Sequence, residues 1–331
     1  MKNRAETDFY LINSTDYYNT PLKKANEREL YKDMITIREM ELLLKNLFIE
    51  KRIRGFCHLV IGQEAIYAAL KHVLQGDKVV GSYRCHGLAY ASGISVQEIV
   101  CELLGKVNGN CKGKGGSMHL YNETFYGGHG IVGAQVPIGT GVAYALKYKN
   151  TDGVCYTFFG DGAANQGQVF ESFNMAKLWN LPVVFVCENN FYSMWTLQED
   201  STTNTRYFER GINIPGIRIN GNDIDELILA FTYSREFAKV NGPIIIQIDT
   251  YRTCEHSCID KDDFYRKKSE IEEMKNQDGL SIFKERLTKE TSAGVVSEIE
   301  EDVQDFISSV EKMALNSEDP PASDLYSDII S

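Results

Sequence analysis

Apolar side chains recur every three or four positions in several parts of the chain, which is the spacing of a helix with one buried face. Between residues 25 and 52 this stripe comprises Leu30, Met34, Ile37, Met40, Leu44 and Leu47. A second helix is predicted from Gln63 to Gln75, and Ser95 with Glu98 has the spacing of a capping box that begins a third. We expect the first of these helices to pack on the core.

The middle of the chain alternates between short apolar runs and a helix. Val154 to Phe159 and Leu181 to Cys187 are predicted strands, and Gln166 to Trp179 between them is a predicted helix. Strand, helix and strand in this order form the unit of a parallel sheet. Pro243 to Tyr251 adds another apolar strand, which suits a sheet covered on both faces. The pattern therefore predicts an α/β fold whose parallel sheet has helices on both faces.

Two segments depart from this alternation. Residues 105–141 are so rich in glycine that we expect neither an ordinary helix nor an ordinary strand there. Near the C-terminus, helical spacing continues through an acidic segment, at Val295, Ile299, Val303, Phe306, Val310 and Met313. The tail SEDPPASD that follows is typical of a turn or loose strap. We accordingly expect an N-terminal extension (1–24), a main domain (25–290), and a C-terminal helix and tail (291–331).

Composition narrows the possible partners. With 331 residues, 43% hydrophobic and 24% charged, the chain resembles an ordinary globular protein with one large core. The formal charge of -11 argues against nucleic acid, and no apolar run of about 18 residues points to a membrane span. The first twenty residues have neither the apolar core of a secretory signal nor the Arg-rich, acid-poor character of a mitochondrial presequence. We therefore expect a cytoplasmic protein without nucleic-acid or membrane partners.

The eight cysteines are scattered without the spacing of a disulfide framework, so we expect most of them to be reduced and several to be buried. They stand at positions 57, 85, 101, 111, 155, 187, 254 and 258. Cys254, His256 and Cys258 lie close together in the sequence. Because they have no second pair of ligands, they match no common zinc pattern.

The most informative chemical signal is Gly160-Asp161-Gly162-Ala163 at the end of one predicted strand, with Glu188-Asn189-Asn190 at the end of the next. Ligands bind at this edge of a parallel sheet. The glycines allow backbone N–H groups to approach an anion, while Asp161 is suited to a hard cation. A strand-helix-strand unit brings Asp161 and Asn190 to one edge, where two oxygen ligands and a diphosphate would suit magnesium. Taken alone, the first motif would equally fit a plain strand-to-helix turn.

Longer motifs extend this signal to the level of a family. They are GFCHL at 55–59 with GQEA at 62–65, YRCHG at 83–87, GKGGSMHLY at 113–121, FYGGHGIVGAQVPIGTG at 125–141, GDGAANQGQVFE at 160–171 and ENNFYSM at 188–194. In this order, from about residue 27 to residue 252, the chain resembles the alpha subunits of thiamine-diphosphate-dependent 2-oxo-acid dehydrogenases. The pyruvate dehydrogenase group is the most similar, and the acetoin and branched-chain groups share the GDG and NN motifs.

The resemblance implies the thiamine-diphosphate-binding fold and an oxidoreductase that uses thiamine diphosphate and Mg²⁺. Such an enzyme decarboxylates pyruvate or a similar 2-oxo acid and passes the acyl group to a lipoyl carrier. It works with a beta subunit in an α2β2 heterotetramer and with a lipoyl-bearing acyltransferase. The alternatives are an acetoin dehydrogenase alpha subunit, a thiamine-dependent carboligase subunit of a specialised biosynthetic pathway, and a non-catalytic cofactor-binding subunit.

The same resemblance places the metal and the diphosphate at the GDG edge. Asp161, the side chain of Asn190 and the carbonyl of Tyr192 would hold the magnesium ion. Four further residues would contact the diphosphate, namely Tyr83, Arg84, Gly162 and Ala163. A guanidinium fork matches phosphate geometry well, although on its own Arg84 would also fit an exposed ion pair.

Further matching positions concern the cofactor ring and the substrate. Gly130 and Val132 correspond to residues whose backbone holds the aminopyrimidine ring. His58 and His256 match the active-site histidines near the thiazolium and substrate, so we expect both to be catalytic and His256 also to contact the cofactor. Without the resemblance, His58 would equally fit a hydrogen-bonded core histidine. A glutamate of the partner chain activates the cofactor in this family, so we expect the chain to be inactive alone.

One loop differs from the usual family pattern, which has Gly-His-Ser followed by Ser-Asp-Pro. Here the glycine is Glu255 and the proline is Lys261, whereas His256, Ser257 and Asp260 match. Ser257 corresponds to a serine that is phosphorylated in eukaryotic relatives. It would equally fit a plain loop serine.

A second difference follows the NN motif. Ser193 and Trp195 stand where pyruvate dehydrogenases commonly have small glycines. A tryptophan in place of glycine removes both space and backbone freedom. Because both loops border the active-site entrance in the family, the sequence leaves the substrate and the acyl acceptor open.

Overall fold

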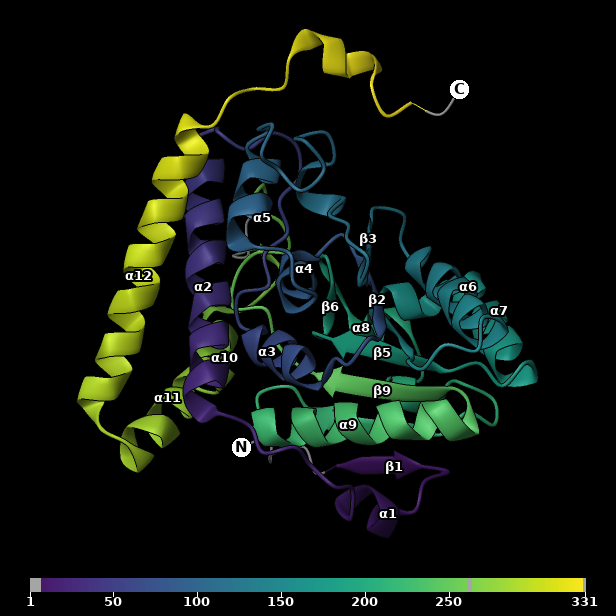
Figure 1. Ribbon diagram of the computed structural model, residues 1–331. Helices are drawn as coiled ribbons and strands as arrows, with labels where there is room; N and C mark the ends of the chain where they lie inside the picture. The colour runs from purple at the N-terminus through teal and green to yellow at the C-terminus, as the bar shows by residue number, and fades with distance from the viewer. Residues whose placement is uncertain (1–6, 261–263, 330–331) are drawn as a thin grey trace.

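The computed structural model describes residues 7–260 and 264–329. At its centre is a seven-stranded sheet with the order β1-β8-β9-β5-β4-β2-β3 (Figure 1). Neighbouring strands run parallel except at the edge, where β1 pairs antiparallel with β8. The strands are β1 (Asp8–Tyr10), β2 (Lys78–Ser82), β3 (Phe125–His129), β4 (Cys155–Gly160), β5 (Val183–Asn189), β8 (Gly216–Asn220) and β9 (Ile244–Asp249). The predicted α/β fold with a parallel sheet is confirmed.

Helices cover both faces of this sheet, as Figure 1 shows. One face is packed by α3 (Glu64–Val73) and α9 (Ile224–Asn241), and α12 (Ala293–Asn316) lies along α2 (Glu27–Ile49) as an outer layer. The opposite face is packed by α6 and α7. The bounds of the other helices are α1 (Ser14–Tyr18), α4 (His86–Ala91), α5 (Val96–Leu103), α6 (Gln135–Tyr148), α7 (Gly167–Leu178), α8 (Gln198–Ser201), α10 (Lys268–Lys275) and α11 (Gly279–Glu290).

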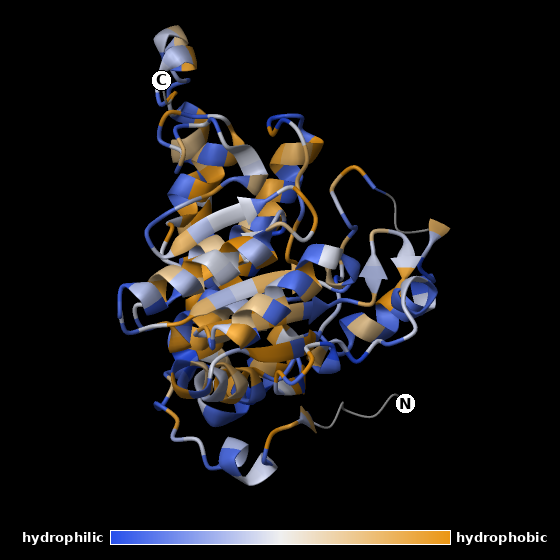
Figure 2. Ribbon diagram, turned by 90° about the vertical axis from the view of Figure 1, so that its right-hand side faces the viewer, coloured by the Kyte–Doolittle hydropathy of each residue, from blue (hydrophilic) through white to orange (hydrophobic). Residues whose placement is uncertain are grey.

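The central strands are buried on both faces because their side chains alternate between two apolar clusters. In β5, Val184 and Val186 belong to the cluster under α3 and α9, whereas Val183 and Phe185 belong to the cluster under α6 and α7. Figure 2 shows these strands in largely hydrophobic colours, with mixed colours on the outer helices. Within the described ranges, no helix combines the length and the apolar character that crossing a bilayer requires.

The helices predicted from apolar spacing are confirmed in position. The stripe between residues 25 and 52 becomes α2, the acidic C-terminal stripe becomes α12, and Gln166 to Trp179 becomes α7. At α5, Ser95 and Glu98 form the predicted capping box, because each side chain accepts a hydrogen bond from the backbone N–H of the other residue.

The expectation that residues 105–141 contain neither helix nor strand was wrong. They include all of β3 and the first half of α6. The glycines here serve close packing as well as turns. A Cβ atom on Gly139 of α6 would lie 1.9 Å from Thr157 Oγ1 of β4, so only glycine lets this helix approach the sheet.

The preceding loop, residues 105–116, is organised by one buried carboxylate. Glu102 is fully buried at the end of α5 and accepts four backbone N–H groups, from Cys111 and Gly113 on one oxygen and from Gly115 and Gly116 on the other. Such an acceptor satisfies donors that would otherwise lack partners. The glycine-rich loop is therefore fixed by a side chain that lies before it in the sequence.

Candidate functional site

A cavity of about 290 Å³ lies at the carboxyl ends of β2, β4 and β5. Most of the predicted site residues line it, namely Tyr83, Arg84, Val132, Asp161, Gly162, Ala163, Asn190, Tyr192 and His256. Gly130 and His58 are not in its lining, but Gly130 lies between the lining residues His129 and Val132, and the His58 ring contacts Tyr83 in a tilted arrangement. A larger groove of about 800 Å³ lies between the N-terminal segment and α9, and none of the predicted site residues lies there.

Strand pairing places Asp161 and Asn190 together. In the parallel pair of β4 and β5, Gly160 is opposite Glu188, so the loops that follow the two strands leave the sheet at the same edge. The short hairpin of β6 (Tyr192–Ser193) and β7 (Thr196–Leu197) then folds back over the first of these loops. A Cβ atom on Gly162 would lie 2.4 Å from Ser193 Oγ, so the glycine permits this close approach.

The Asp161 carboxylate is held inside the protein without a cation among the described residues. It is 2% exposed, and its Oδ2 accepts a hydrogen bond of 2.9 Å from Ser193 Oγ. Burial raises the pKa of Asp161, and the hydrogen bond from Ser193 opposes this shift. A buried carboxylate whose pKa stays raised despite nearby hydrogen-bond donors and Arg252 is suited to a metal ion, which would favour its charged form.

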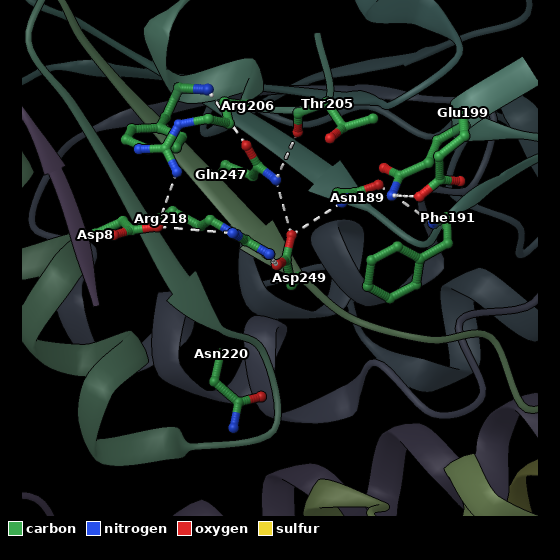
Figure 3. A network of polar contacts seen from close by, with 12 residues as sticks. Asp8, Asn189, Phe191, Glu199, Thr205, Arg206, Arg218, Asn220, Gln247 and Asp249 are labelled. Carbon is green, nitrogen blue, oxygen red and sulfur yellow. Dashed lines mark hydrogen bonds and ion pairs between the residues drawn. The ribbon is translucent and has the colours of Figure 1, made fainter. Parts of the chain in front are cut away.

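The two asparagines of the NN motif face different surroundings. Asn190 lines the cavity, and its Oδ1 accepts a 3.1 Å hydrogen bond from Arg252 Nε. Asn189 instead donates a 2.9 Å hydrogen bond to Asp249 Oδ1 in the neighbouring strand β9 (Figure 3). Asp249 also binds Arg218 and Gln247, as the same view shows. The family resemblance predicted Asn190 and not Asn189 as the metal ligand. The strand pattern alone does not separate them, because sheet register decides which one faces the cavity.

Two segments distant in sequence are joined at the other wall by Arg84. This side chain is 6% exposed, and its guanidinium donates to the backbone carbonyls of Leu59 at 2.5 Å and His256 at 2.8 Å. In the described part of the chain no carboxylate lies within ion-pair distance of it. The interpretation of Arg84 as an exposed ion-pair partner is therefore wrong, and its charge is available to an anion.

The two predicted histidines lie against each other beside this arginine. Their ring centroids are 5.3 Å apart, and Tyr83 contacts both rings. Burial, followed by repulsion from Arg84, lowers the pKa of His58 to about 3 and that of His256 to about 2. Both imidazoles are therefore neutral near pH 7, so each offers one hydrogen-bond donor and one acceptor.

Glu188 is a site residue that sequence reasoning missed. It is buried in the cavity lining and accepts a 2.7 Å hydrogen bond from the Tyr67 hydroxyl. Burial raises its pKa to about 7, while the bond from Tyr67 and the charge of Arg84 oppose the rise. Its position directly before the NN motif at a strand end was the available signal.

Several buried polar atoms around the cavity have no hydrogen-bond partner within residues 7–260 and 264–329. They are Gln63 Oε1, His129 Nε2, Gln135 Oε1, His58 Nδ1 and Arg252 Nη2. Gln63, His129 and Gln135 line the cavity, so a polar ligand bound there would give their buried atoms partners. Carboxylate and amide oxygens on one side with a guanidinium on the other fit a divalent cation and an anion bound together.

Comparison with known proteins gives this arrangement a family. The profile described as "Dehydrogenase E1 component" matches residues 32–319. The chain belongs to the dehydrogenase E1 family. The E1 alpha subunit type I of pyruvate dehydrogenase from Ascaris suum, a mitochondrial protein, is 45% identical over 94% of this chain and 80% of its own length. The mitochondrial E1 alpha subunit of Saccharomyces cerevisiae is 48% identical over 81% of this chain and 64% of its own length. The testis-specific mitochondrial form of Homo sapiens is 42% identical over 96% and 83%.

These relatives correct the expected location. The E1 proteins named above are all mitochondrial, which contradicts the cytoplasmic expectation. That expectation rested on the composition of the first twenty residues. An Arg-rich, acid-poor composition identifies a mitochondrial presequence where it occurs. The lack of this composition in the first twenty residues carries no information on the compartment in which an E1 chain works.

Of the residues that differ from the usual E1 pattern, Ser193, Glu255 and Trp195 lie within the described ranges, and Ser193 is the one of these three that lines the cavity and bonds Asp161. Glu255 forms a 2.9 Å ion pair with Lys45. Trp195 is half exposed, and its ring contacts Phe264 with centroids 5.1 Å apart. Ser257, which matches the pattern, is buried, and its hydroxyl donates to Asp260. The remaining difference, at position 261, lies outside the described residues.

Proposed function

We propose that this chain is the alpha subunit of a thiamine-diphosphate-dependent 2-oxo-acid dehydrogenase that decarboxylates pyruvate together with a beta subunit. The observation that carries the proposal is the meeting of Asp161 and Asn190 at one sheet edge, in the same cavity as Arg84, which has no ion-pair partner among residues 7–260 and 264–329. The E1 family match over residues 32–319 and the names of the relatives agree with it.

The cofactor would occupy the cavity in a defined orientation. Asp161, Asn190 and the carbonyl of Tyr192 would hold magnesium. Tyr83, Arg84 and the backbone of Gly162 and Ala163 would hold the diphosphate, while the backbone of Gly130 and Val132 would hold the aminopyrimidine ring. When bound, thiamine diphosphate supplies the carbon nucleophile and the electron sink for decarboxylation of a 2-oxo acid.

The protein's own residues would bind the cofactor, orient the 2-oxo acid and keep additional positive charge away from the substrate. Arg84 attracts the negative diphosphate, and the raised pKa of Asp161 indicates a carboxylate that gains from a cation. His58 and His256 are neutral, so they can hydrogen-bond a polar substrate without adding positive charge. In this arrangement they position the 2-oxo acid and exchange protons with it through Nδ1 or Nε2.

The proposed partners are a beta subunit, in an α2β2 heterotetramer, and a lipoyl-bearing acyltransferase. Exposed apolar rings on α6 and at the end of α7 support a partner chain at that face: Tyr144 packs against Trp179 with centroids 5.6 Å apart, and Tyr148 is 81% exposed. Contiguous apolar surface of this kind marks protein interfaces.

The test is to purify the chain with its beta subunit and to follow pyruvate decarboxylation coupled to reduction of an artificial electron acceptor. Acceptor reduction that needs thiamine diphosphate and Mg²⁺ is the expected result. Carbon–carbon bond formation without an acceptor would instead identify a carboligase, and preferential use of acetoin would identify an acetoin dehydrogenase. Tight cofactor binding without any turnover would identify a non-catalytic subunit.

A further inference from the structure

Two cysteines meet where the segment around His58 contacts the loop that carries His256. The backbone N–H of Cys258 donates a 2.9 Å hydrogen bond to the carbonyl of Cys57. The two thiols are near enough that each shifts the pKa of the other. Arg84 joins the same two segments through the carbonyls of Leu59 and His256, so the thiols lie at a fixed junction rather than in a free loop.

The spacing of this junction suits a disulfide. The 2.9 Å backbone hydrogen bond holds Cys57 and Cys258 close together, although neither lies in a strand. Residues paired by backbone hydrogen bonds in sheets have Cα atoms about 5.5 Å apart. Disulfides in proteins span Cα separations of about 4.4 to 6.8 Å. Closing the bond between Cys57 and Cys258 therefore requires rotation of two side chains and little movement of the backbone.

The two thiols differ in reactivity. Cys57 is fully buried, and its pKa is raised by the hydrogen bond to Cys258 and by burial. Cys258 is partly exposed, and the hydrogen bond from Cys57 lowers its pKa, with help from Lys45 and against burial, Glu41 and Glu255. The thiolate is the form that attacks an oxidant, so Cys258 is the reactive thiol and Cys57 is placed to resolve it.

We propose that Cys57 and Cys258 form a reversible redox pair in which a peroxide oxidises Cys258 and Cys57 then closes a disulfide beside the histidines. In the first step the Cys258 thiolate attacks one peroxide oxygen, which gives a sulfenic acid and, after protonation, one water. In the second step the Cys57 sulfur displaces the hydroxyl of the sulfenic acid as a second water. The two thiols lose two electrons in total, and the peroxide accepts them.

The disulfide would affect turnover because of its position. Cys57 directly precedes His58, and Cys258 follows His256 by two residues. A covalent bond here prevents the two histidine-bearing segments from separating when substrate enters or product leaves. We therefore expect oxidation to slow pyruvate turnover reversibly, a consequence that rests on the proposed function.

The direct test is a peptide map that needs no turnover. The full chain with its beta subunit is treated with hydrogen peroxide, digested without reductant and analysed by mass spectrometry. We expect a cross-linked pair of peptides containing Cys57 and Cys258, two hydrogens lighter than the free peptides and lost after dithiothreitol. In Cys57→Ser the sulfenic acid on Cys258 should persist and react with dimedone. If peroxide takes wild-type Cys258 to sulfinic acid without this cross-link, the redox pair is wrong.

Cys111 provides a matched control, since it is also partly exposed but its pKa is raised by burial. Cys111→Ser should leave the cross-link and the peroxide sensitivity unchanged, and labelling of Cys111 as fast as Cys258 would count against the proposed asymmetry. In the activity assay, peroxide should slow the wild type several-fold and leave Cys258→Ser unaffected. A cross-link that leaves turnover unchanged would overturn the regulatory role. An unoxidised complex without turnover would contradict the proposed function and leave the peptide map to decide the redox pair.

Discussion

The cavity has two walls that are built differently. At the sheet edge, Asp161 and Asn190 follow two paired strands, so the ladder between β4 and β5 fixes their separation. At the other wall, His256 lines the cavity and His58 packs against it, both in segments that are neither helix nor strand, and Arg84 joins these segments through the carbonyls of Leu59 and His256. Strand ends position chemical groups through local pairing, whereas the histidine wall depends on one side chain that reaches distant parts of the chain. The two walls should therefore respond differently to mutation and to pH.

The largest expected effect is at the sheet edge, from Asp161→Ala. We expect the affinity for thiamine diphosphate with Mg²⁺ to fall at least about 100-fold, because residues that merely support metal ligands are worth roughly 10- to 100-fold. Folding should not suffer, since burial raises the pKa of Asp161 and the charged side chain is costly in the free protein. Calorimetric titration and thermal unfolding measure the two effects separately.

Asn190 and Asn189 make the same test sharper. Asn190→Ala should weaken cofactor binding as Asp161→Ala does, whereas Asn189→Ala should lower stability through its lost bond to Asp249 and leave the affinity intact. Equal cofactor affinity in all three variants and the wild type would remove the metal from this edge.

The next effect concerns the histidine wall and pH. In the folded chain the pKa values of His58 and His256 are about 3 and about 2, below their ordinary value of 6.5. Below pH 6.5 the unfolded chain therefore binds more protons than the folded chain. The stability that the two neutral histidines contribute is fully present above pH 6.5, and the free energy of unfolding falls as the pH drops below it. Two such groups should together cost about 2 to 3 kcal/mol between about pH 7.5 and about pH 5.5.

Urea denaturation at these two pH values checks the prediction. His58→Gln should remove about half of the pH-dependent loss, and the difference between variant and wild type cancels the opposite contribution of Glu188, whose pKa is raised. A loss of the same size in His58→Gln and in the wild type would mean that His58 is protonated in the folded chain.

A third effect tests how the glycine-rich loop reaches the cavity. In Glu102→Gln, one of the two acceptor oxygens becomes an NH₂ group that faces two backbone donors. Leaving buried donors unsatisfied should lower stability by about 2 kcal/mol. Hydrogen exchange should quicken at the amides of Cys111, Gly113, Gly115 and Gly116. Glu98→Gln one turn earlier keeps an acceptor for the capping box, so it should cost less, and equal effects would contradict the role given to Glu102.

The difference between the walls also explains what the sequence could predict. The sheet edge followed from apolar runs and their order, because a strand-helix-strand unit has one usual geometry. The residues of the histidine wall were predicted from a family resemblance. Nothing in the local pattern indicated that Arg84 would bind the carbonyl of His256, 172 positions away. Glu188 and Glu102 were missed for a similar reason. Their roles depend on burial and on partners that only tertiary packing defines.

The smallest expected effect is at the outer loop, from Trp195→Gly. The sequence suggests that this tryptophan takes space from the active site, but its side chain is 50% exposed and it does not line the cavity, whereas Met194 does. Its main contact is the edge-to-face packing on Phe264, itself 61% exposed. Because substitutions at such surfaces usually change stability by less than about 0.5 kcal/mol, unfolding and cofactor affinity should stay near the wild type.

A measurement of substrate preference tests whether this tryptophan lies beside the substrate channel or in it. We expect the KM for pyruvate to change by less than about 3-fold in Trp195→Gly, which corresponds to about 0.6 kcal/mol, with no new preference for longer 2-oxo acids. Phe264→Ala removes the partner ring without touching the hairpin, so it should have the same small effect. If Trp195→Gly instead accepted a longer 2-oxo acid many times better than the wild type, the indole would fill the channel in the assembled enzyme. The outer loop would then resemble the histidine wall, because its position at the substrate would depend on contacts between distant parts of the assembled enzyme and not on strand pairing.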